Sequence, residues 1–265
     1  MAGPSSKVAS RIADGLKKFQ GILSTAKSKD VNESNTVVIV TDILSEIFGY
    51  DKYSEITTEH AIKSTWCDLA ISIDGAIKIL VEVKAIGLEL KENHIKQAVD
   101  YAANQGVDWV ILTNGAIWKV FKVSFTKPIN QELVVDVDMM SLAPKTGSDI
   151  ETLYLLSKEG TEKYALDDIY TQRQATNKFL IGNLLLTDDI LNAIRKELRQ
   201  IYPDIKVQIE GIRDTLEKDV LKREVVEGDE AERAKKKISR ADRKQQRAKQ
   251  NSASEKAPSS ESSAQ

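Results

Sequence analysis

The chain contains very few of the residues that build covalent or metal-based scaffolds. One cysteine and two histidines occur in 265 residues, which excludes an internal disulfide framework and a thiolate zinc cluster. No uncharged apolar run approaches the roughly 20 residues that span a bilayer. The amino-terminal segment also lacks the apolar block of a secretory leader. We therefore expect a cytoplasmic protein with no membrane contact, folded around its own hydrophobic core.

A phosphate-cradling loop is missing as well. No segment matches G-x-x-x-x-G-K-[ST], so we expect no ATPase motor and no nucleotide cofactor. Cys67 has no evident base partner, and we expect it to pack as a small, partly buried residue, as free cysteines usually do. His60 and His94 do not have the spacing of zinc ligands and are expected at the surface or at a hinge.

Charge is balanced overall but unevenly distributed. The chain has 38 basic and 40 acidic side chains, for a net charge of −2. Residues 1–30 hold six basic and two acidic side chains, and residues 231–250 hold nine and two. Basic ends on an acidic body suit a polyanionic partner, because lysine and arginine that bind phosphates release counterions. The alternative is that these charged segments only keep the protein soluble.

Hydrophobic periodicity predicts both helices and strands, and therefore an α/β (α+β) fold. The expected helices cover 7–24, 33–48 and 94–105, and the expected strands cover 68–73, 76–83, 107–113, 116–123 and 132–137. After a joint at 144–149 the pattern is helical, over 150–157, 161–185, 188–201 and 210–225. From residue 227 onward Ile238 is the only large apolar residue, so this segment is expected to be largely disordered, with a solvated helix within 228–248 as the alternative.

These patterns divide the chain into four parts. The expected parts are an amino-terminal amphipathic helix (1–30), a central α/β domain (31–143), a helical appendage (150–226) and a charged, serine-rich tail (227–265). The appendage is a candidate for a homodimer contact, for contact with DNA or for docking of a partner protein.

The feature that carries chemistry is a predicted hairpin with carboxylates on both strands. Side chains alternate along a strand, so Glu82 and Lys84 share one face of the second strand. If Leu69 pairs with Val81, one face becomes entirely apolar and Asp68 lies directly across from Glu82. This register needs an odd loop (Asp74-Gly75-Ala76) or a bulge, because a two-residue Asp74-Gly75 turn would slip the pairing by one residue.

Two opposed carboxylates repel each other unless a positive charge lies between them. Mg²⁺ is the simplest candidate, because it accepts one or two carboxylates, a backbone carbonyl such as that of Val83, water and phosphate oxygens. With Lys84 beside the ion, Asp68 and Glu82 would suffice for phosphodiester hydrolysis. The alternative is a solvated sheet face with an Asp68–Lys84 contact, since Glu89-Leu90-Lys91 shows that the same spacing also arises by chance.

The order of elements resembles the PD-(D/E)xK nuclease superfamily, and more narrowly the N-terminal nuclease domain of type I restriction enzyme R subunits. The resemblance spans about 30–125 and is carried by Cys67-Asp68-Leu-Ala-Ile, Val81-Glu-Val-Lys-Ala85, Gln97-Ala-Val-Asp-Tyr101 and Trp109-Val-Ile-Leu-Thr-Asn-Gly115. It implies a restriction-endonuclease-like fold, in which helices flank a mixed β-sheet. Cys67 replaces the proline that often precedes the aspartate, and the helicase motor of the R subunit is missing, so ATP-driven translocation is not implied.

The resemblance also implies roles for individual residues. Asp68 and Glu82 would hold Mg²⁺, and Lys84 would be the catalytic lysine. A glutamate of the early helix would join the metal; Glu33 is our choice, with Glu46 as its rival and Glu59 as a weaker third. The catalytic set would further include Gln97 and Tyr101, which lie four residues apart on one helical face beside the site.

Three functional hypotheses follow. The first is a Mg²⁺-dependent endonuclease that hydrolyses DNA in a restriction or defence system without its own ATPase motor. The second is a catalytically silent nuclease-fold protein that binds DNA or serves as an adaptor. The third is a nuclease directed at RNA. Sequence specificity is not predicted, because no base-reading element is identifiable.

Overall fold

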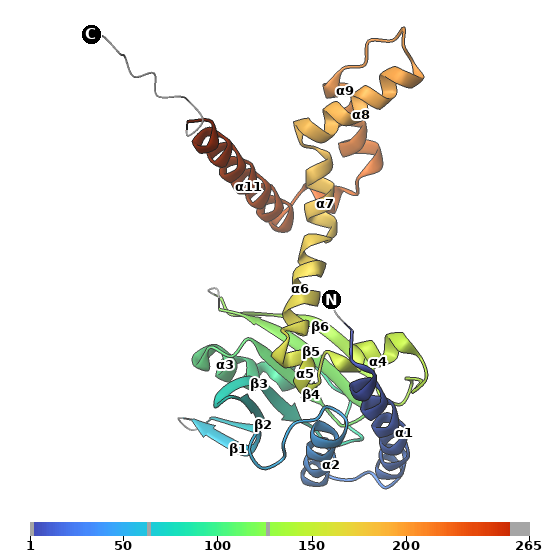
Figure 1. Cartoon of the computed structure of the whole chain (residues 1–265), viewed down its shortest axis with the longest axis vertical. Coiled ribbons are helices and arrows are strands. Elements are labelled where there is room, and N and C mark those ends of the chain that lie inside the picture. The colour runs from blue at the N-terminus through green and yellow to red at the C-terminus, as the bar shows by residue number, and fades with distance from the viewer. Residues whose placement is uncertain (1–2, 63–64, 126–127, 255–265) are drawn as a thin grey trace, which may run out of the picture. The chain divides into compact units, whose positions relative to one another are not determined.

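A computed structural model describes residues 3–62, 65–125 and 128–254 (Figure 1). The chain divides into two compact units, Met1–Tyr170 and Thr171–Gln265, and each is described by itself. Within the described residues, no helix is both long enough and apolar enough to cross a membrane.

The first unit combines a six-stranded sheet with helices on both of its faces (Figure 1). Its elements are, in chain order, α1 (Ser6–Ser28), α2 (Glu33–Glu46), β1 (Ile56–Ile62), β2 (Thr65–Ile73), β3 (Ala76–Val83), the 3-10 turn η1 (Glu92–Ile95), α3 (Lys96–Gln105), β4 (Trp109–Thr113), β5 (Ile117–Ser124), β6 (Asn130–Asp138), α4 (Gly147–Tyr154), α5 (Lys158–Glu162) and the start of α6 (Ala165–Ala175). This arrangement confirms the predicted α/β fold class.

The strands follow one another across the sheet in the order β1-β2-β3-β4-β5-β6. β3 and β4 pair in parallel, and the other neighbouring strands pair antiparallel. A parallel pair needs a crossover connection, which η1 and α3 supply. β1 was not expected, because its Thr-Thr-Glu-His sequence lacks the apolar alternation of the other strands.

α1 and α2 cover one face of the sheet and close the larger core. In α1 the residues Val8, Ile12, Leu16, Phe19 and Leu23 recur every three or four positions, and all five are buried. They pack with buried residues of α2, of α4 and of the inward-facing positions of the strands. Ser5 begins α1 by accepting a hydrogen bond from the Val8 N–H, as an N-cap serine does.

α3 covers the opposite face and forms a second, smaller core. Ala98, Val99 and Ala102 of this helix pack against the other set of strand side chains, which includes Leu80 and Leu112. α3 ends at Gly106, whose φ of 70° is the left-handed conformation that glycine adopts without a Cβ clash. The central strands are therefore buried on both faces, which explains their nearly continuous apolar sequences.

The first unit extends beyond the domain limit expected at residue 143. Ile150 and Leu153 of α4, together with Leu166 of α6, belong to the same core as α1 and the sheet. α1 is likewise an integral layer of this unit and not a separate segment. Residues 150–170, which the sequence analysis assigned to the appendage, thus complete the first unit.

The second unit is helical. After the end of α6 it contains α7 (Lys178–Leu185), α8 (Asp188–Ile201), α9 (Ile209–Thr215), the π-helical turn η2 (Leu216–Val220), α10 (Arg223–Val226) and α11 (Asp229–Ser254). The predicted helix over 161–185 is broken twice, at Tyr164, whose φ is 56°, and at Asn177, which caps α7. Of the tail expected to be largely disordered, residues 229–254 form α11, where the alternative placed a helix within 228–248, and residues 255–265 lie outside the described residues.

Candidate active site

The candidate site begins where β3 ends. Pairing of β3 with β4 continues past Val83, because the Lys84 N–H donates to the Thr113 carbonyl at 2.8 Å. Val81 and Val83 lie in the core under α1 and α2, while Leu80 lies in the core under α3. By strand alternation Glu82 therefore points to the α3 side of the sheet, where only 10% of its side chain is exposed.

β2 brings Asp68 to the same end of the sheet. Leu69 pairs with Val81 and Ile71 pairs with Ile79, which is the register that the apolar face predicted. The Asp68 carboxylate then accepts a hydrogen bond from the Val83 N–H at 2.7 Å. Asp68 is thus fixed beside the residue that follows Glu82, and the negative charge of Asp68 acts on Glu82.

A bulge makes this register compatible with a tight turn. The hairpin closes through Asp74 and Gly75, whose φ values of 52° and 75° are typical of a two-residue type I′ turn. Beyond Ile71 the pairing shifts to Ser72–Ile77, which leaves Lys78 as the extra residue of β3. The bulge places Ala76 opposite Ile73.

Lys84 connects the carboxylates of two elements. Its Nζ donates to Glu82 Oε1 at 2.7 Å and lies 3.6 Å from Glu33 Oε1. Glu33 is the first residue of α2, which begins where the Asn32 side chain accepts from the Asn35 N–H. The ammonium group therefore links the start of α2 to the end of β3.

Burial and mutual repulsion shift the ionisation of these groups. Burial raises the pKa of Asp68, although the Val83 N–H and Lys84 act in the opposite direction. Burial also raises the pKa of Glu82, and the charges of Asp68 and Glu33 add to this effect. For Lys84, burial opposes the charged form, but the hydrogen bond to Glu82 and the surrounding carboxylates outweigh it and raise the pKa. Burial thus opposes ionisation of the two carboxyls, whereas the carboxylates around Lys84 favour its charged form.

The donors that Mg²⁺ would meet at this site are the carboxylates of Asp68 and Glu82 and the carbonyl of Val83. Two carboxylates and the adjacent Val83 carbonyl suit this ion, which usually takes one or two protein carboxylates and completes its octahedron with water and phosphate oxygens. In the described part of the chain, no group of three histidine, cysteine, aspartate or glutamate side chains could hold a metal by itself. Glu33 reaches the site through Lys84, and its direct contact with an ion stays a prediction.

The rival glutamates have different surroundings. Glu46 lies at the far end of α2 from Glu33, about 20 Å away at 1.5 Å per residue, and forms an ion pair with Lys18. It does not belong to the site. Glu59 lies on β1, but its side chain is outside the described residues.

α3 places the two remaining predicted residues differently. Tyr101 is buried in the core under α3, and burial together with the nearby Cys67 raises its pKa. Gln97, one turn earlier, is exposed. Cys67 is fully buried and donates to the carbonyls of Leu69 and Val81, and burial with the charges of Glu82 and Asp68 raises its pKa to about 12. The predicted packing role of this cysteine is confirmed.

Asn114 is a positioning residue that the sequence analysis treated only as part of a turn. Its side chain donates to the carbonyls of Ile86 and Leu88, at 3.3 and 3.0 Å. It also accepts from the N–H groups of Ala116 and Ile117. Asn114 thereby fastens the segment that follows Lys84 to the β4–β5 turn. The Asn-Gly pair was the available signal, but sequence alone does not give its contact with the distant loop.

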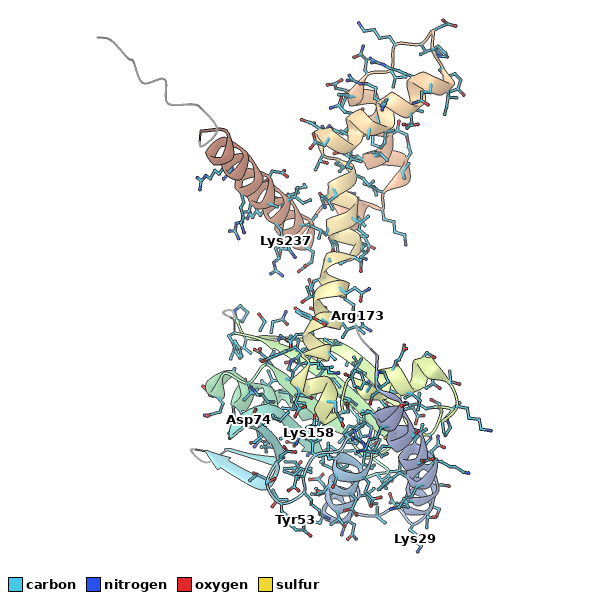
Figure 2. All side chains as sticks on the ribbon, viewed as in Figure 1. Lys29, Tyr53, Asp74, Lys158, Arg173 and Lys237 are labelled. Carbon is cyan, nitrogen blue, oxygen red and sulfur yellow. The ribbon has the colours of Figure 1, made fainter. Side chains whose placement is uncertain are left out.

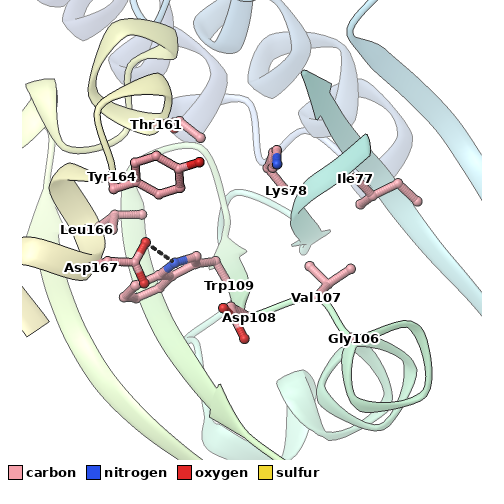
Figure 3. A pocket seen from close by; sticks show the side chains of 10 residues that line it. All are labelled: Ile77, Lys78, Gly106, Val107, Asp108, Trp109, Thr161, Tyr164, Leu166 and Asp167. Atoms are coloured by element: carbon pink, nitrogen blue, oxygen red, sulfur yellow. Dashed lines mark hydrogen bonds between the residues drawn. The ribbon is translucent and has the colours of Figure 1, made fainter. Parts of the chain in front are cut away.

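A cavity of about 180 Å³ lies at the opposite end of the same strands (Figure 3). Lys78 and Trp109 line it, roughly five residues or 17 Å along the sheet from the acidic end of β3. Asp167 closes one side, where it accepts from the Trp109 indole at 3.3 Å and pairs with Lys122 (Figure 3). These contacts occupy the charged groups of Asp167 and Lys122, and we assign the cavity no part in the reaction.

Comparison with known families is consistent with this geometry. Residues 39–135 match the family model described as the type I restriction enzyme R protein N terminus. The match covers 97 of the 265 residues. The matched residues include Asp68, Glu82 and Lys84, together with Gln97 and Tyr101, whereas Glu33 and α1 precede them. Comparisons with curated proteins and with solved structures gave no significant match. The similarity to this family supports a nuclease of the restriction type that interacts with DNA.

Proposed function

We propose that this protein is a Mg²⁺-dependent endonuclease that hydrolyses phosphodiester bonds of DNA and needs no ATP. The observation that carries the proposal is the meeting of three groups at one end of β2 and β3. Asp68 accepts from the Val83 N–H at 2.7 Å, and Lys84 lies 2.7 Å from Glu82. The family of residues 39–135 supports a nuclease, and these side chains supply the chemistry for it.

Asp68 and Glu82 would hold the ion with the Val83 carbonyl. Because burial raises the pKa of both carboxyls, a divalent cation relieves a charge repulsion that the fold itself creates. When bound, Mg²⁺ polarises the scissile phosphate and makes a bound water a better nucleophile. The remaining ligand positions are then available to water and substrate oxygens.

Lys84 would orient the attacking water or accept a proton from it. Without an ion, the hydrogen bond to Glu82 and the surrounding carboxylates raise the pKa of Lys84. An ammonium group at this position would orient the attacking water and offset the negative charge that develops on the phosphate. Its contact with Glu33 would hold the side chain in place while the substrate binds.

The chain offers a matched control for the test. Glu89 and Lys91 have the same spacing as Glu82 and Lys84, but both are exposed and their charged atoms are 3.9 Å apart. We would measure the nicking of supercoiled plasmid with Mg²⁺ or EDTA and without ATP. Asp68→Asn, Glu82→Gln and Lys84→Gln should abolish Mg²⁺-dependent nicking, whereas Glu89→Gln and Lys91→Gln should retain it.

Two results would contradict the proposal. Equal nicking by the wild type and by the three site variants would mean that another activity is being measured. Binding of DNA without turnover by the wild type would favour the catalytically silent nuclease-fold alternative. Parallel assays with labelled duplex DNA, single-stranded DNA and RNA would show whether RNA is the true substrate. Protein partners or a homodimer through 150–226 stay predictions.

A further inference from the structure

α11 has a strongly one-sided distribution of charge. Its buried residues are Ala231, Ala234 and Ile238, which lie within about 60° of one another at about 100° per residue. α11 packs against α7, the helix it contacts most. Six exposed basic residues lie on the opposite side of α11, within about 120°. These six residues, which we call the basic stripe, are Lys236, Lys237, Arg240, Arg243, Lys244 and Arg247.

The basic stripe is not neutralised by ion pairs within the described residues. Earlier in the helix, Arg233 pairs with Glu230 and Lys235 pairs with Glu232, so the first two turns neutralise themselves. None of the six stripe residues forms an ion pair in the part of the chain that the structure describes. Asp242, the one acidic residue among them, lies on the α7 side of the helix. Lys237 is labelled on α11 in Figure 2.

Helix stability does not explain this arrangement. Lysine and arginine favour a helix when they lie in its last turn, near the negative end of the macrodipole. The last turn of α11 contains no basic residue, and the stripe occupies the middle of the helix. Arg240 also has a like charge four residues before it, at Lys236, and four residues after it, at Lys244, and such spacing destabilises a helix. The stripe therefore lowers the stability of α11 when no partner is bound.

We propose that the basic stripe is a binding surface for the phosphate backbone of duplex DNA, which holds the substrate without reading its sequence. This inference rests on the proposed function and adds a second element to it, outside the nuclease domain. The stripe spans twelve residues, whose first and last are about 16 Å apart along the helix. Duplex DNA carries one negative charge per about 1.7 Å of its axis, so the same length presents more than enough phosphates for six cations.

The composition of α11 argues against an anionic membrane as the partner. A helix that lies on a bilayer inserts a broad apolar face opposite its charges. In α11 the apolar face consists of two alanines and Ile238, and all three are buried in the fold. Three arginines in the stripe also suit phosphate, because a guanidinium group can donate two parallel hydrogen bonds to it.

The salt dependence of binding tests the proposal in the full-length protein. We would measure the anisotropy of a short labelled duplex of arbitrary sequence in EDTA, where no Mg²⁺-dependent cleavage occurs. Six phosphate contacts predict a slope of log K against log salt of about −5, or about a thousandfold loss of affinity between about 50 and 200 mM salt. Glutamine at all six stripe positions should remove most of this slope, and Arg240→Gln alone should reduce it by about 1.

A second variant separates position from net charge. It carries glutamine at six exposed basic residues elsewhere, namely Lys145, Lys163, Lys196, Arg199, Lys206 and Lys222. This variant loses the same charge as the stripe variant but should keep the wild-type slope. Glutamine is a good helix former, and unchanged circular dichroism would verify that α11 persists in the stripe variant. Equal losses in both variants, or an unchanged slope in the stripe variant, would overturn the proposal.

Further measurements distinguish DNA from other polyanionic partners and separate this inference from the proposed function. Tighter binding to vesicles rich in phosphatidylserine, or to duplex RNA, than to duplex DNA would also overturn it. Asp68→Asn should bind the duplex with the wild-type slope while it fails to nick DNA. If the wild type binds through the stripe but never cleaves, only the proposed function fails; if it cleaves and the stripe variant binds normally, only this inference fails.

Discussion

Asp68 has two separable tasks in the structure, and two substitutions at this position test them. The carboxylate brings negative charge to the proposed metal site, and it also accepts the Val83 N–H at 2.7 Å. Asp68→Asn removes the charge but keeps an oxygen for that hydrogen bond. Asp68→Ala removes both and leaves the N–H of the fully buried Val83 without this acceptor.

The structure sets the size of the expected difference. A buried donor that loses its partner costs about 1–3 kcal/mol, and we expect the lower part of this range because Asp68 is only half-buried. For a unit of this size, each kcal/mol shifts the melting temperature by about 2–4 °C. In EDTA, Asp68→Ala should therefore melt about 3–6 °C below Asp68→Asn. The comparison is internal, because both variants lack the charge that repels Glu82.

The assay is thermal unfolding followed by circular dichroism, with and without Mg²⁺. The wild type should gain stability with Mg²⁺, since a ligand that binds only the folded state stabilises it, and both variants should lose most of that gain. Asp68→Asn should be at least as stable as the wild type in EDTA, because it removes a buried repulsion. Equal melting temperatures for the two variants in EDTA would refute the placement of Asp68 against β3, and with it the geometry of the site.

Two other predictions concern pH and the glycine before Tyr50. Burial raises the pKa of Asp68 and Glu82 in the folded protein, so the stability of the metal-free protein should fall as pH rises from the ordinary carboxyl range through the raised values. The Mg²⁺-induced gain in melting temperature should grow over the same range, and a gain that is constant between about pH 4 and pH 8 would contradict this. Gly49→Ala should destabilise the first unit by about 1–2 kcal/mol, because φ is +83° and a Cβ would lie 2.6 Å from the Arg11 guanidinium that donates to Phe48 and Glu159. Gly21→Ala, in an open position of α1, should instead stabilise by about 0.5–1 kcal/mol in the same urea titration.

The fold could be predicted where a hydrophobic period lies between clear end signals. α8 has the expected bounds, 188–201, because its apolar residues recur regularly between such signals, although Leu191 is its one buried residue. The helix expected over 161–185 fails for the opposite reason. Its hydrophobic period runs on through Tyr164, where the backbone takes a φ of 56°, and no glycine or proline marks the break. Asn177, which caps α7, was a usable signal that periodicity obscured.

Small residues carry the packing of α11, so its docking was not evident from the sequence. Ile238 is the only large apolar residue after 227, and this favoured disorder over the alternative helix. In the structure Ala231 and Ala234 are buried beside Ile238. Alanine also has the highest helix propensity, so a segment with few large side chains can still form a helix that docks through one narrow face. What remains exposed on α11 is its charge.

The site was predictable because a single strand register both buries the apolar side chains and brings the carboxylates together. Pairing Leu69 with Val81 buries the apolar side chains under α1 and α2, and the same pairing brings Asp68 to the residues around Glu82. A two-residue turn at Asp74 and Gly75 would by itself slip this register by one residue. The extra residue Lys78 compensates for this one-residue shift. The hairpin can therefore keep the two-residue turn at one end and the Leu69–Val81 pairing at the other. The sequence indicates that the hairpin needs either a bulge or a longer loop. It does not distinguish these two, because both bury the same side chains near Asp68 and Glu82. The bulge therefore links the turn chemistry of Asp74 and Gly75 to the alignment of carboxylates at the other end of the hairpin.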